Sequence, residues 1–283
     1  MIGYGDIGRR VVASWQHQGV DLYTFGRRDK QADGLGQHIQ LDLDDPVTLQ
    51  QLSWLPSDEA TIYYFAPPPG EGKTDPRMAN FLTALGPLPK QIVYISTSGV
   101  YGDCRGEWVA ESRPPKPATP RSQRRLAAEQ SLQQWCKAKG VACIILRVGG
   151  IYGPQRLPLA RLKTGMSVLR CNLAPYSNRI HADDLAQICV AAARCPHKHA
   201  IYNVSDGHPS TMSDYVISIA RAANLPPPTE IDWDTARRTL SPAMLSYLSE
   251  SKRLDNRKMR RELKISLHYP SLTEGLNACA LDD

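Results

Sequence analysis

Two periodic patterns of hydrophobic residues alternate along the first half of the chain. Short runs of strand-forming residues predict strands over 20–25, 39–43, 61–66, 91–96 and 141–148. Between them, apolar residues recur three or four positions apart, as on one face of a helix, at Ile7, Val11 and Trp15 and again at Ala128, Leu132, Trp135 and Cys136. Strands that alternate with helices are typical of a parallel sheet covered on both faces, so we expect a doubly wound α/β fold.

The alternation of predicted strands and helices ends after Gly149. Helices are predicted over 185–193 and 215–223, and loops that contain proline and glycine separate them. We therefore expect residues 1–150 to form the sheet domain and residues 151–283 to form a smaller lobe, from which some segments return to the first domain. Four prolines within 113–120 predict an extended loop ahead of a helix.

The composition argues against a disordered chain, a collagen and a bare coiled coil. Hydrophobic residues make up 42% and charged residues 22% of the chain, which is ordinary globular usage. No apolar run approaches the roughly 18 residues of a membrane helix, and no secretory signal opens the sequence, so we expect a cytoplasmic protein without membrane contact. The 7 cysteines include no CxxC pair, which indicates reduced thiols.

The distribution of charge and of metal-ligating residues argues against nucleic acid and metal ions as ligands. The net charge of +6 suits an anionic ligand, but it is not concentrated as a nucleic-acid site requires. The basic run 252–261 carries Leu254 and Met259, so it is interpreted as an amphipathic stretch packed on one face. Cys195, His197 and His199 lack a second ligand pair at zinc spacing, so no metal is expected.

The sequence Gly3-Tyr4-Gly5-Asp6-Ile7-Gly8 is a GxGxxG turn that leads into an amphipathic helix. Glycines there allow a tight turn and a close approach of a diphosphate to the backbone, and the helix N-terminus offers unpaired N–H groups. We therefore predict a Rossmann-type dinucleotide site whose residues are Gly3, Gly5, Asp6, Ile7 and Gly8. A plain turn is the other interpretation.

Two arginines stand where an NAD-binding chain carries an acid. An acid for the ribose 2′-hydroxyl is expected about twenty residues past the glycines, and here the strand ends in Gly26-Arg27-Arg28. Because a guanidinium pairs well with phosphate, Arg27 and Arg28 favour NADP over NAD as the cofactor. The alternative is that both are solvated loop charges.

Two further strand ends are candidates for cofactor contacts. Asp42 and Leu43 lie at the end of the predicted strand 39–43, where a carboxylate and an apolar side chain would meet an adenine ring. Ala66 and Pro67 lie at the end of the predicted strand 61–66, where the cofactor would run past, although a structural turn explains these residues equally well.

The strand before the glycine turn is short, because only Met1 and Ile2 precede Gly3. A strand of about five or six residues is expected there. We therefore expect residues upstream of Met1 to complete it.

Together these residues resemble the extended and atypical short-chain dehydrogenase/reductases, the family that includes nucleotide-sugar epimerases and dehydratases. The resemblance continues in order through YISTSGVYGD at 94–103, LRVGGIYGP at 146–154, NRIHADDLA at 178–186 and YNV at 202–204. In the family, a catalytic Ser or Thr lies three residues before the Val of Val-Tyr-Gly, which implies Thr97 here, and the neighbouring Ser98 is the alternative. The resemblance also implies a homodimer formed through a helix pair.

The family's Tyr-x-x-x-Lys has no counterpart in this sequence. Alignment on the preceding proline and the following Glu-Gln puts the two positions at Arg121 and Arg125. An arginine does not exchange protons near neutral pH, but Arg125 can replace the lysine as a cation over the cofactor ribose. The resemblance is therefore to the atypical subgroup, which retains the cofactor fold and loses the catalytic pair.

Other side chains near the family's cofactor could supply the proton. Tyr101, Tyr152 and His181 are the candidates, because their motifs surround the cofactor in the family fold. The alternative is structural: the tyrosines anchor loops, and His181 supports the following helix start together with Asp183.

These observations predict an NADP-dependent oxidoreductase or epimerase-like enzyme that acts on a small polar or sugar-like substrate between the sheet domain and the smaller C-terminal substrate lobe. Hydride would pass to or from the nicotinamide, with Thr97 hydrogen-bonding the reacting oxygen. The alternative is a non-catalytic protein that senses NADP(H) or scaffolds a partner.

Overall fold

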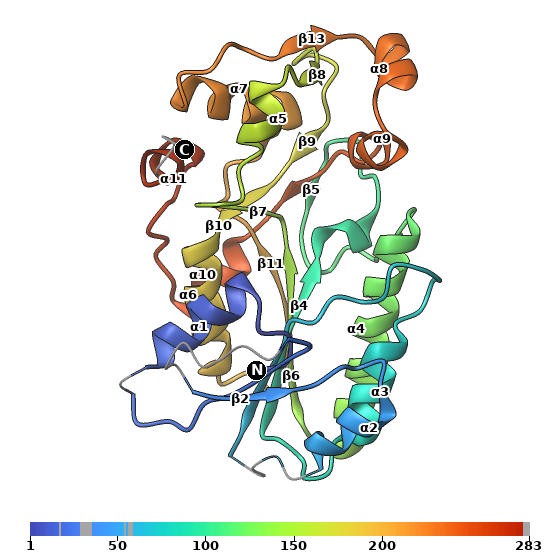
Figure 1. The fold of residues 1–283 in the computed structure, drawn as a ribbon, viewed down its shortest axis with the longest axis vertical. Coiled ribbons are helices and arrows are strands. Elements are labelled where there is room, and N and C mark those ends of the chain that lie inside the picture. Colours follow the sequence, from blue (N-terminus) through green and yellow to red (C-terminus); the bar gives the residue numbers. More distant parts are fainter. Residues whose placement is uncertain (17, 29–35, 54, 56–58, 280–283) are drawn as a thin grey trace.

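A parallel sheet with helices on both faces forms the centre of the computed structural model, which describes residues 1–16, 18–28, 36–53, 55 and 59–279 (Figure 1). The sheet strands are β1 (Tyr23–Gly26), β2 (Gln37–Gln40), β3 (Thr61–Tyr64), β4 (Gln91–Thr97), β6 (Ala142–Val148) and β11 (His199–Val204). Strands β11, β6, β4 and β3 pair in that order, and β1 pairs with β2, all in parallel. The doubly wound α/β prediction is confirmed.

Ile2 joins the two groups of strands. It forms parallel bridges to Phe25 in β1 and to Tyr64 in β3. Its N–H donates to the Tyr63 carbonyl and its carbonyl accepts from Phe65 N–H, both at 2.8 Å. The residue directly before the glycine turn is thus held from both sides in the middle of the sheet, and its side chain is 1% exposed.

Helices cover the sheet on each face. Helix α1 (Asp6–Trp15), α6 (Ala182–Ala193) and α10 (Arg257–Leu263) share one apolar core with the sheet. On the other face lie α2 (Pro46–Leu49), the 3₁₀ turn η1 (Gln50–Leu52), α3 (Pro76–Ala84) and α4 (Pro120–Lys139) (Figure 1). The 3₁₀ turn η2 (Ser98–Tyr101) follows β4 and packs against α4.

A second lobe lies beyond one end of the sheet (Figure 1). Its helices are α5 (Leu159–Lys163), α7 (Met212–Ala222), α8 (Trp233–Thr239), α9 (Pro242–Leu248) and α11 (Leu272–Asn277). Short strand pairs build its frame and the junction: β7 (Gly150–Tyr152) with β10 (Arg179–His181), β8 (Ser167–Leu169) with β13 (Thr229–Ile231), β9 (Tyr176–Ser177) with β12 (Ser210–Thr211), and β5 (Trp108–Val109) with β14 (Arg253–Leu254).

The second strand differs from its predicted range. The sequence predicts a strand over 39–43, whereas β2 ends at Gln40. Leu41 and Leu43 are buried, which explains their apolar signal, but the chain already turns between them. There Asp42 N–H donates to Thr48 Oγ1 at 3.0 Å instead of to a neighbouring strand.

The outer edge of β11 is covered by charged side chains. Glu111 Oε1 accepts a hydrogen bond from Asn203 N–H at 2.8 Å, and Lys258 Nζ donates to the Ile201 carbonyl at 3.0 Å. These two contacts take the place of a further strand at that edge. No helix among the described residues is long and apolar enough to cross a membrane.

Candidate functional site

The glycine turn packs closely on itself and on the backbone that follows β3. Gly3 has φ +90°, and a Cβ at this position would lie 2.5 Å from the backbone nitrogen of Ala66. Gly8 is also tight, since its Cβ would lie 3.3 Å from the Gly3 carbonyl oxygen. Gly5 caps α1 with no side-chain hydrogen bond and has no atom within 4 Å of an added Cβ. Open space therefore lies beside Gly5, directly before the N-terminus of α1.

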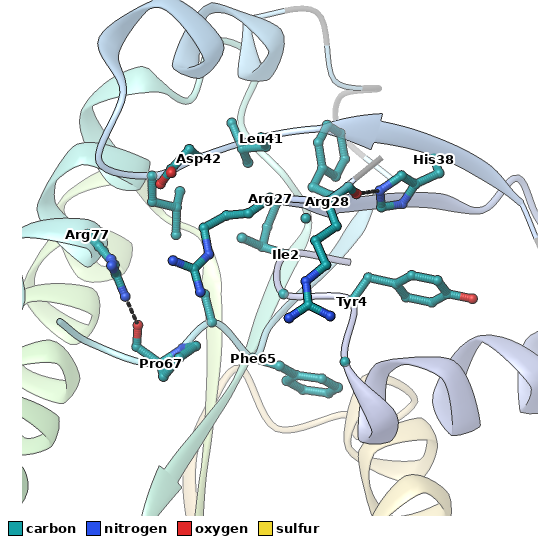
Figure 2. Close-up of a pocket in the computed structure, with 16 residues that line it drawn as sticks. Ile2, Tyr4, Arg27, Arg28, His38, Leu41, Asp42, Phe65, Pro67 and Arg77 are labelled. Atoms are coloured by element: carbon teal, nitrogen blue, oxygen red, sulfur yellow. Dashed lines mark hydrogen bonds between the residues drawn. The ribbon is translucent and has the colours of Figure 1, made fainter. Parts of the chain in front are cut away.

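A cavity of about 330 Å³ opens at this turn, between the ends of β1, β2 and β3 (Figure 2). Its wall brings together residues that lie far apart in the sequence, including Gly3, Gly5, Arg27, Arg28, Asp42, Leu43, Ala66 and Pro67. Asp6, Ile7 and Gly8 continue from the turn into α1. Thr97 and Arg125 do not line this cavity.

Two guanidinium groups extend from the end of β1 into the cavity. Figure 2 shows Arg27 and Arg28 side by side, with their guanidiniums directed toward the space above Phe65 and Pro67. Neither forms an ion pair with any residue that the structure describes. The cavity therefore presents positive charge that an anionic ligand can neutralise.

His38, a residue that sequence reasoning missed, holds the backbone beneath these arginines. Its Nε2 lies 2.9 Å from the Arg28 carbonyl oxygen, and its Nδ1 lies 2.8 Å from Thr24 Oγ1. The strand-like alternation around it gives no sign of this role, because the contact depends on the pairing of β1 with β2.

Arg77 is a second cavity residue that sequence reasoning missed. Its Nε donates to both carboxylate oxygens of Asp44 at 2.9 Å, and its Nη1 donates to the Pro67 carbonyl at 3.1 Å. The ion pair with Asp44 raises the pKa of Arg77 above its ordinary value. The only signal in the sequence is the Asp75-Pro76 helix start just before it. Arg77 ties the end of β3 to the turn that carries Asp42.

The predicted catalytic threonine lies at the start of η2. Thr97 is half-buried, and its Oγ1 accepts a hydrogen bond from Gly99 N–H at 3.2 Å. Arg125, on α4, donates to the Ile95 carbonyl at 3.0 Å and to Tyr94 Oη at 3.3 Å. The helix and the turn touch closely, since a Cβ on Gly99 would lie 2.7 Å from a side-chain oxygen of α4. Arg125 is thus anchored on the strand that ends at Thr97.

Tyr101 is enclosed on the other side of η2. Its hydroxyl donates to Asn203 Oδ1 at 2.7 Å, and the Arg147 guanidinium carbon lies 4.8 Å from its ring centroid. The side chain is 1% exposed, and burial raises the pKa of its hydroxyl. Proton transfer by Tyr101 would require this internal hydrogen bond to break.

Tyr152 and His181 lie together where β7 pairs with β10. Their rings meet edge to face with centroids 5.2 Å apart. Tyr152 donates to the Ser271 carbonyl at 3.3 Å, and His181 Nδ1 accepts from Asp183 N–H at 3.2 Å, capping α6. Burial raises the pKa of Tyr152 and lowers that of His181. These contacts match the structural interpretation of both residues, and a catalytic role for them stays a prediction.

Comparison with known proteins supports the family resemblance. Residues 77–205 match the model of the NAD dependent epimerase/dehydratase family. Human dTDP-D-glucose 4,6-dehydratase is 24% identical over 123 residues, which cover 41% of this chain and 35% of that protein. The chain thus spans about a third of the length of this curated relative.

Two solved structures share the fold over nearly the full length. A conserved protein of unknown function from Silicibacter pomeroyi is 27% identical with a TM-score of 0.78, covering 98% of this chain and 95% of that one. MoeE5 in complex with UDP-glucose and NAD is 20% identical with a TM-score of 0.77, at the same coverage. Residues 77–205 are therefore similar to the NAD dependent epimerase/dehydratase family, and nearly the whole chain shares the Rossmann-type α/β fold of these two solved structures.

Proposed function

We propose that this protein binds NADP(H) and acts as an oxidoreductase or epimerase-like enzyme on a sugar-like substrate. The observation that carries the proposal is the cavity at the glycine turn, into which Arg27 and Arg28 direct two guanidiniums without an ion-pair partner among the described residues. A ribose 2′-phosphate supplies the doubly charged, hydrogen-bond-accepting group that such a pair recognises.

The residues of the cavity fit a dinucleotide. Gly5 leaves open space at the N-terminus of α1, where a diphosphate would approach the unpaired N–H groups of the helix, and Gly3 lets the turn pack closely on Ala66. Asp42 offers a carboxylate for the exocyclic amine of an adenine, and Leu43 adds an apolar surface beside it. Ala66 and Pro67 form the wall along which the cofactor would pass.

The chain's own residues would then orient the reacting groups. The nicotinamide, when bound, supplies or accepts hydride. Thr97 has a hydroxyl that can donate to a substrate oxygen, since its present contact uses that oxygen only as an acceptor for Gly99 N–H. Arg125, fixed on the Ile95 carbonyl, holds a positive charge on α4 in place of the family's lysine.

The sugar-like substrate is supported by the relatives. MoeE5 is described in complex with UDP-glucose, and the human relative is a dTDP-D-glucose dehydratase. The second lobe lies beyond the carboxyl end of β4 (Figure 1). Thr97 is the last residue of that strand, so a substrate would enter between the lobe and the sheet there.

Calorimetric titration and thermal unfolding with NADPH and NADH test the cofactor. A ligand that binds only the folded state stabilises it by RT ln(1 + [L]/Kd), about 2.7 kcal/mol at a hundredfold excess over Kd. We expect a larger effect of NADPH than of NADH. Equal responses would contradict the preference for NADP, and no response to either would contradict the cofactor site.

Turnover is tested separately with a panel of nucleotide sugars and small carbonyl compounds. NADPH consumption and sugar isomerisation are the two readouts. Stoichiometric NADPH binding without consumption or isomerisation of any panel member would contradict the enzymatic part of the proposal.

A further inference from the structure

The Asp6 carboxylate ties together parts of the chain that are far apart in sequence. Arg156, in the loop after β7, donates from Nε to Asp6 Oδ2 at 2.6 Å. Arg10, one helical turn along α1, donates from Nε to Asp6 Oδ1 at 2.9 Å. Arg10 also forms an ion pair with Asp183 at the start of α6. One carboxylate thus links the glycine turn to the loop that leads into the second lobe.

The position of Asp6 is electrostatically unusual for a diphosphate site. It is the first residue of α1, next to the Gly5 cap, so its carboxylate lies at the helix end that favours a bound anion. Burial opposes ionisation, but hydrogen bonds from Arg156 and Arg10 hold the pKa of Asp6 below its ordinary value. A charged carboxylate and a diphosphate at the same helix end repel each other unless a cation lies between them.

The two arginines differ in their freedom to act as that cation. Arg10 is held by two carboxylates, Asp6 and Asp183, so its charge is already compensated. The side chain of Arg156 is 31% exposed, and Asp6 is its sole ion-pair partner among the described residues. Arg156 therefore retains donors for a second anion.

The loop that carries Arg156 packs closely against the start of α6. Gly153 has φ +146°, and a Cβ there would lie 3.3 Å from Ala182 Cβ and from His181 Nε2 at the start of α6. Gln155 adopts φ +63°, and Arg156 N–H donates to the Gly153 carbonyl at 3.1 Å. The loop thus packs on the start of α6 and places Arg156 beside the first residue of α1.

We propose that Arg156 is a further cofactor-binding residue, supplied by the loop after β7, whose guanidinium is shared between Asp6 and the cofactor diphosphate. This inference rests on the proposed function, because it requires a dinucleotide at the glycine turn. Asp6 then has two effects: it positions Arg156 while the site is empty, and it competes with the diphosphate for the same guanidinium.

The competition separates this role from a structural tie. If the Asp6–Arg156 pair only held the loop in place, Arg156→Ala would not weaken NADPH binding more than 2′-AMP binding. If Arg156 binds the diphosphate, Arg156→Ala and Asp6→Asn act in opposite directions. Arg156→Ala removes the donor, whereas Asp6→Asn removes its competitor and a repelling charge.

Calorimetric titrations with NADPH and with 2′-AMP, which lacks the diphosphate, test the proposal. We expect Arg156→Ala to weaken NADPH binding about tenfold and to leave 2′-AMP binding unchanged, because only the diphosphate contact is lost. Asp6→Asn is expected to strengthen NADPH binding. Arg161→Ala, which removes an exposed arginine of α5, is the control and should leave both affinities unchanged.

The outcomes separate the two proposals. Two results would overturn the role of Arg156 and leave the proposed cofactor site in place. Arg156→Ala could bind NADPH as tightly as the wild type, or it could lose the same factor of affinity for NADPH and for 2′-AMP. Wild-type protein that binds neither ligand would overturn the cofactor site and this inference with it. Thermal unfolding without ligand checks that each variant is folded.

Discussion

The guanidinium of Arg121 lies over the ring of Tyr247, with Arg121 Cζ 3.9 Å from the ring centroid. Arg121 belongs to the first turn of α4, which covers the sheet, and Tyr247 belongs to α9 of the second lobe. A cation–π contact therefore joins the two parts at the position where our alignment expects the family's tyrosine.

Removal of the Tyr247 ring should loosen α9 more than it destabilises the whole protein. An exposed cation–π contact contributes about 0.5–1 kcal/mol, and Tyr247 is 51% exposed. For Tyr247→Ala we expect faster amide hydrogen exchange in 242–248. The free energy of unfolding of the whole protein should fall by no more than about 1 kcal/mol. Tyr247→Phe retains the ring and is the control. Unchanged exchange in the alanine variant would show that other contacts hold α9.

Two glycines of the same turn should respond differently to alanine. Gly3→Ala places a Cβ 2.5 Å from the backbone of Ala66 at a positive φ, so we expect a loss of roughly 2 kcal/mol or more in urea unfolding. Gly5→Ala meets no atom within 4 Å, so its stability should change by less than about 1 kcal/mol.

Gly5→Ala also tests the cofactor site. The new methyl group of Gly5→Ala would stand where the diphosphate approaches, so NADPH binding should fall at least about tenfold while stability holds. Full NADPH affinity in Gly5→Ala would place the ligand elsewhere.

Charge reversal at Arg27 tests the assignment of the 2′-phosphate. Arg27→Asp replaces a donor to phosphate with a repelling carboxylate, so NADPH affinity should fall by roughly a hundredfold while NADH affinity changes by less than about threefold. Arg237→Asp makes the same charge change on exposed α8 and should affect neither ligand. Parallel losses for both dinucleotides upon Arg27→Asp would contradict the assignment.

Asp206 should make folding depend on pH. Burial raises the pKa of its carboxyl from 3.8 to about 7, and its side chain is 1% exposed. Between those two values the unfolded chain is ionised at this group while the folded protein still binds a proton. Stability from this carboxyl is therefore lost as pH rises from about 4 to about 7, and the loss is complete above that range.

Asp206→Asn should remove this slope, because the amide does not titrate and its oxygen can still accept from His208 N–H. Each pKa unit corresponds to about 1.4 kcal/mol, so the variant should gain a few kcal/mol relative to wild type between pH 5 and pH 8. Urea unfolding at both pH values gives the difference. Parallel profiles for the two proteins would show that Asp206 ionises normally in the folded state.

The sheet and its helices could be predicted because their signals are local. The apolar stripe Ile7, Val11 and Trp15 needs only the helical period, and α1 follows it. The strand β11 is not among the strands that the sequence predicts, and its pairing with β6 joins residues more than fifty positions apart. Long-range pairing of this kind leaves little trace in a short window of sequence.

The residues of the candidate site also differ in whether the local sequence reveals them. Gly3 and Gly5 could be identified because a tight turn before a helix has its own local composition. His38, Arg77 and Arg156 could not, since each contributes through a contact with a residue brought close only by the fold. Motif position also did not reveal that Tyr101 is enclosed by Asn203 and Arg147.

The flank formed by β11 affects how copies of this chain can associate. Glu111 and Lys258 already satisfy the Asn203 N–H and the Ile201 carbonyl. A strand from another molecule could join this edge only by displacing a carboxylate and an ammonium group, each with its own hydration to restore. Self-association by strand addition, including the seeding of a fibril, is therefore disfavoured on this side, and a complex that uses it would have to form through the neighbouring helices and loops.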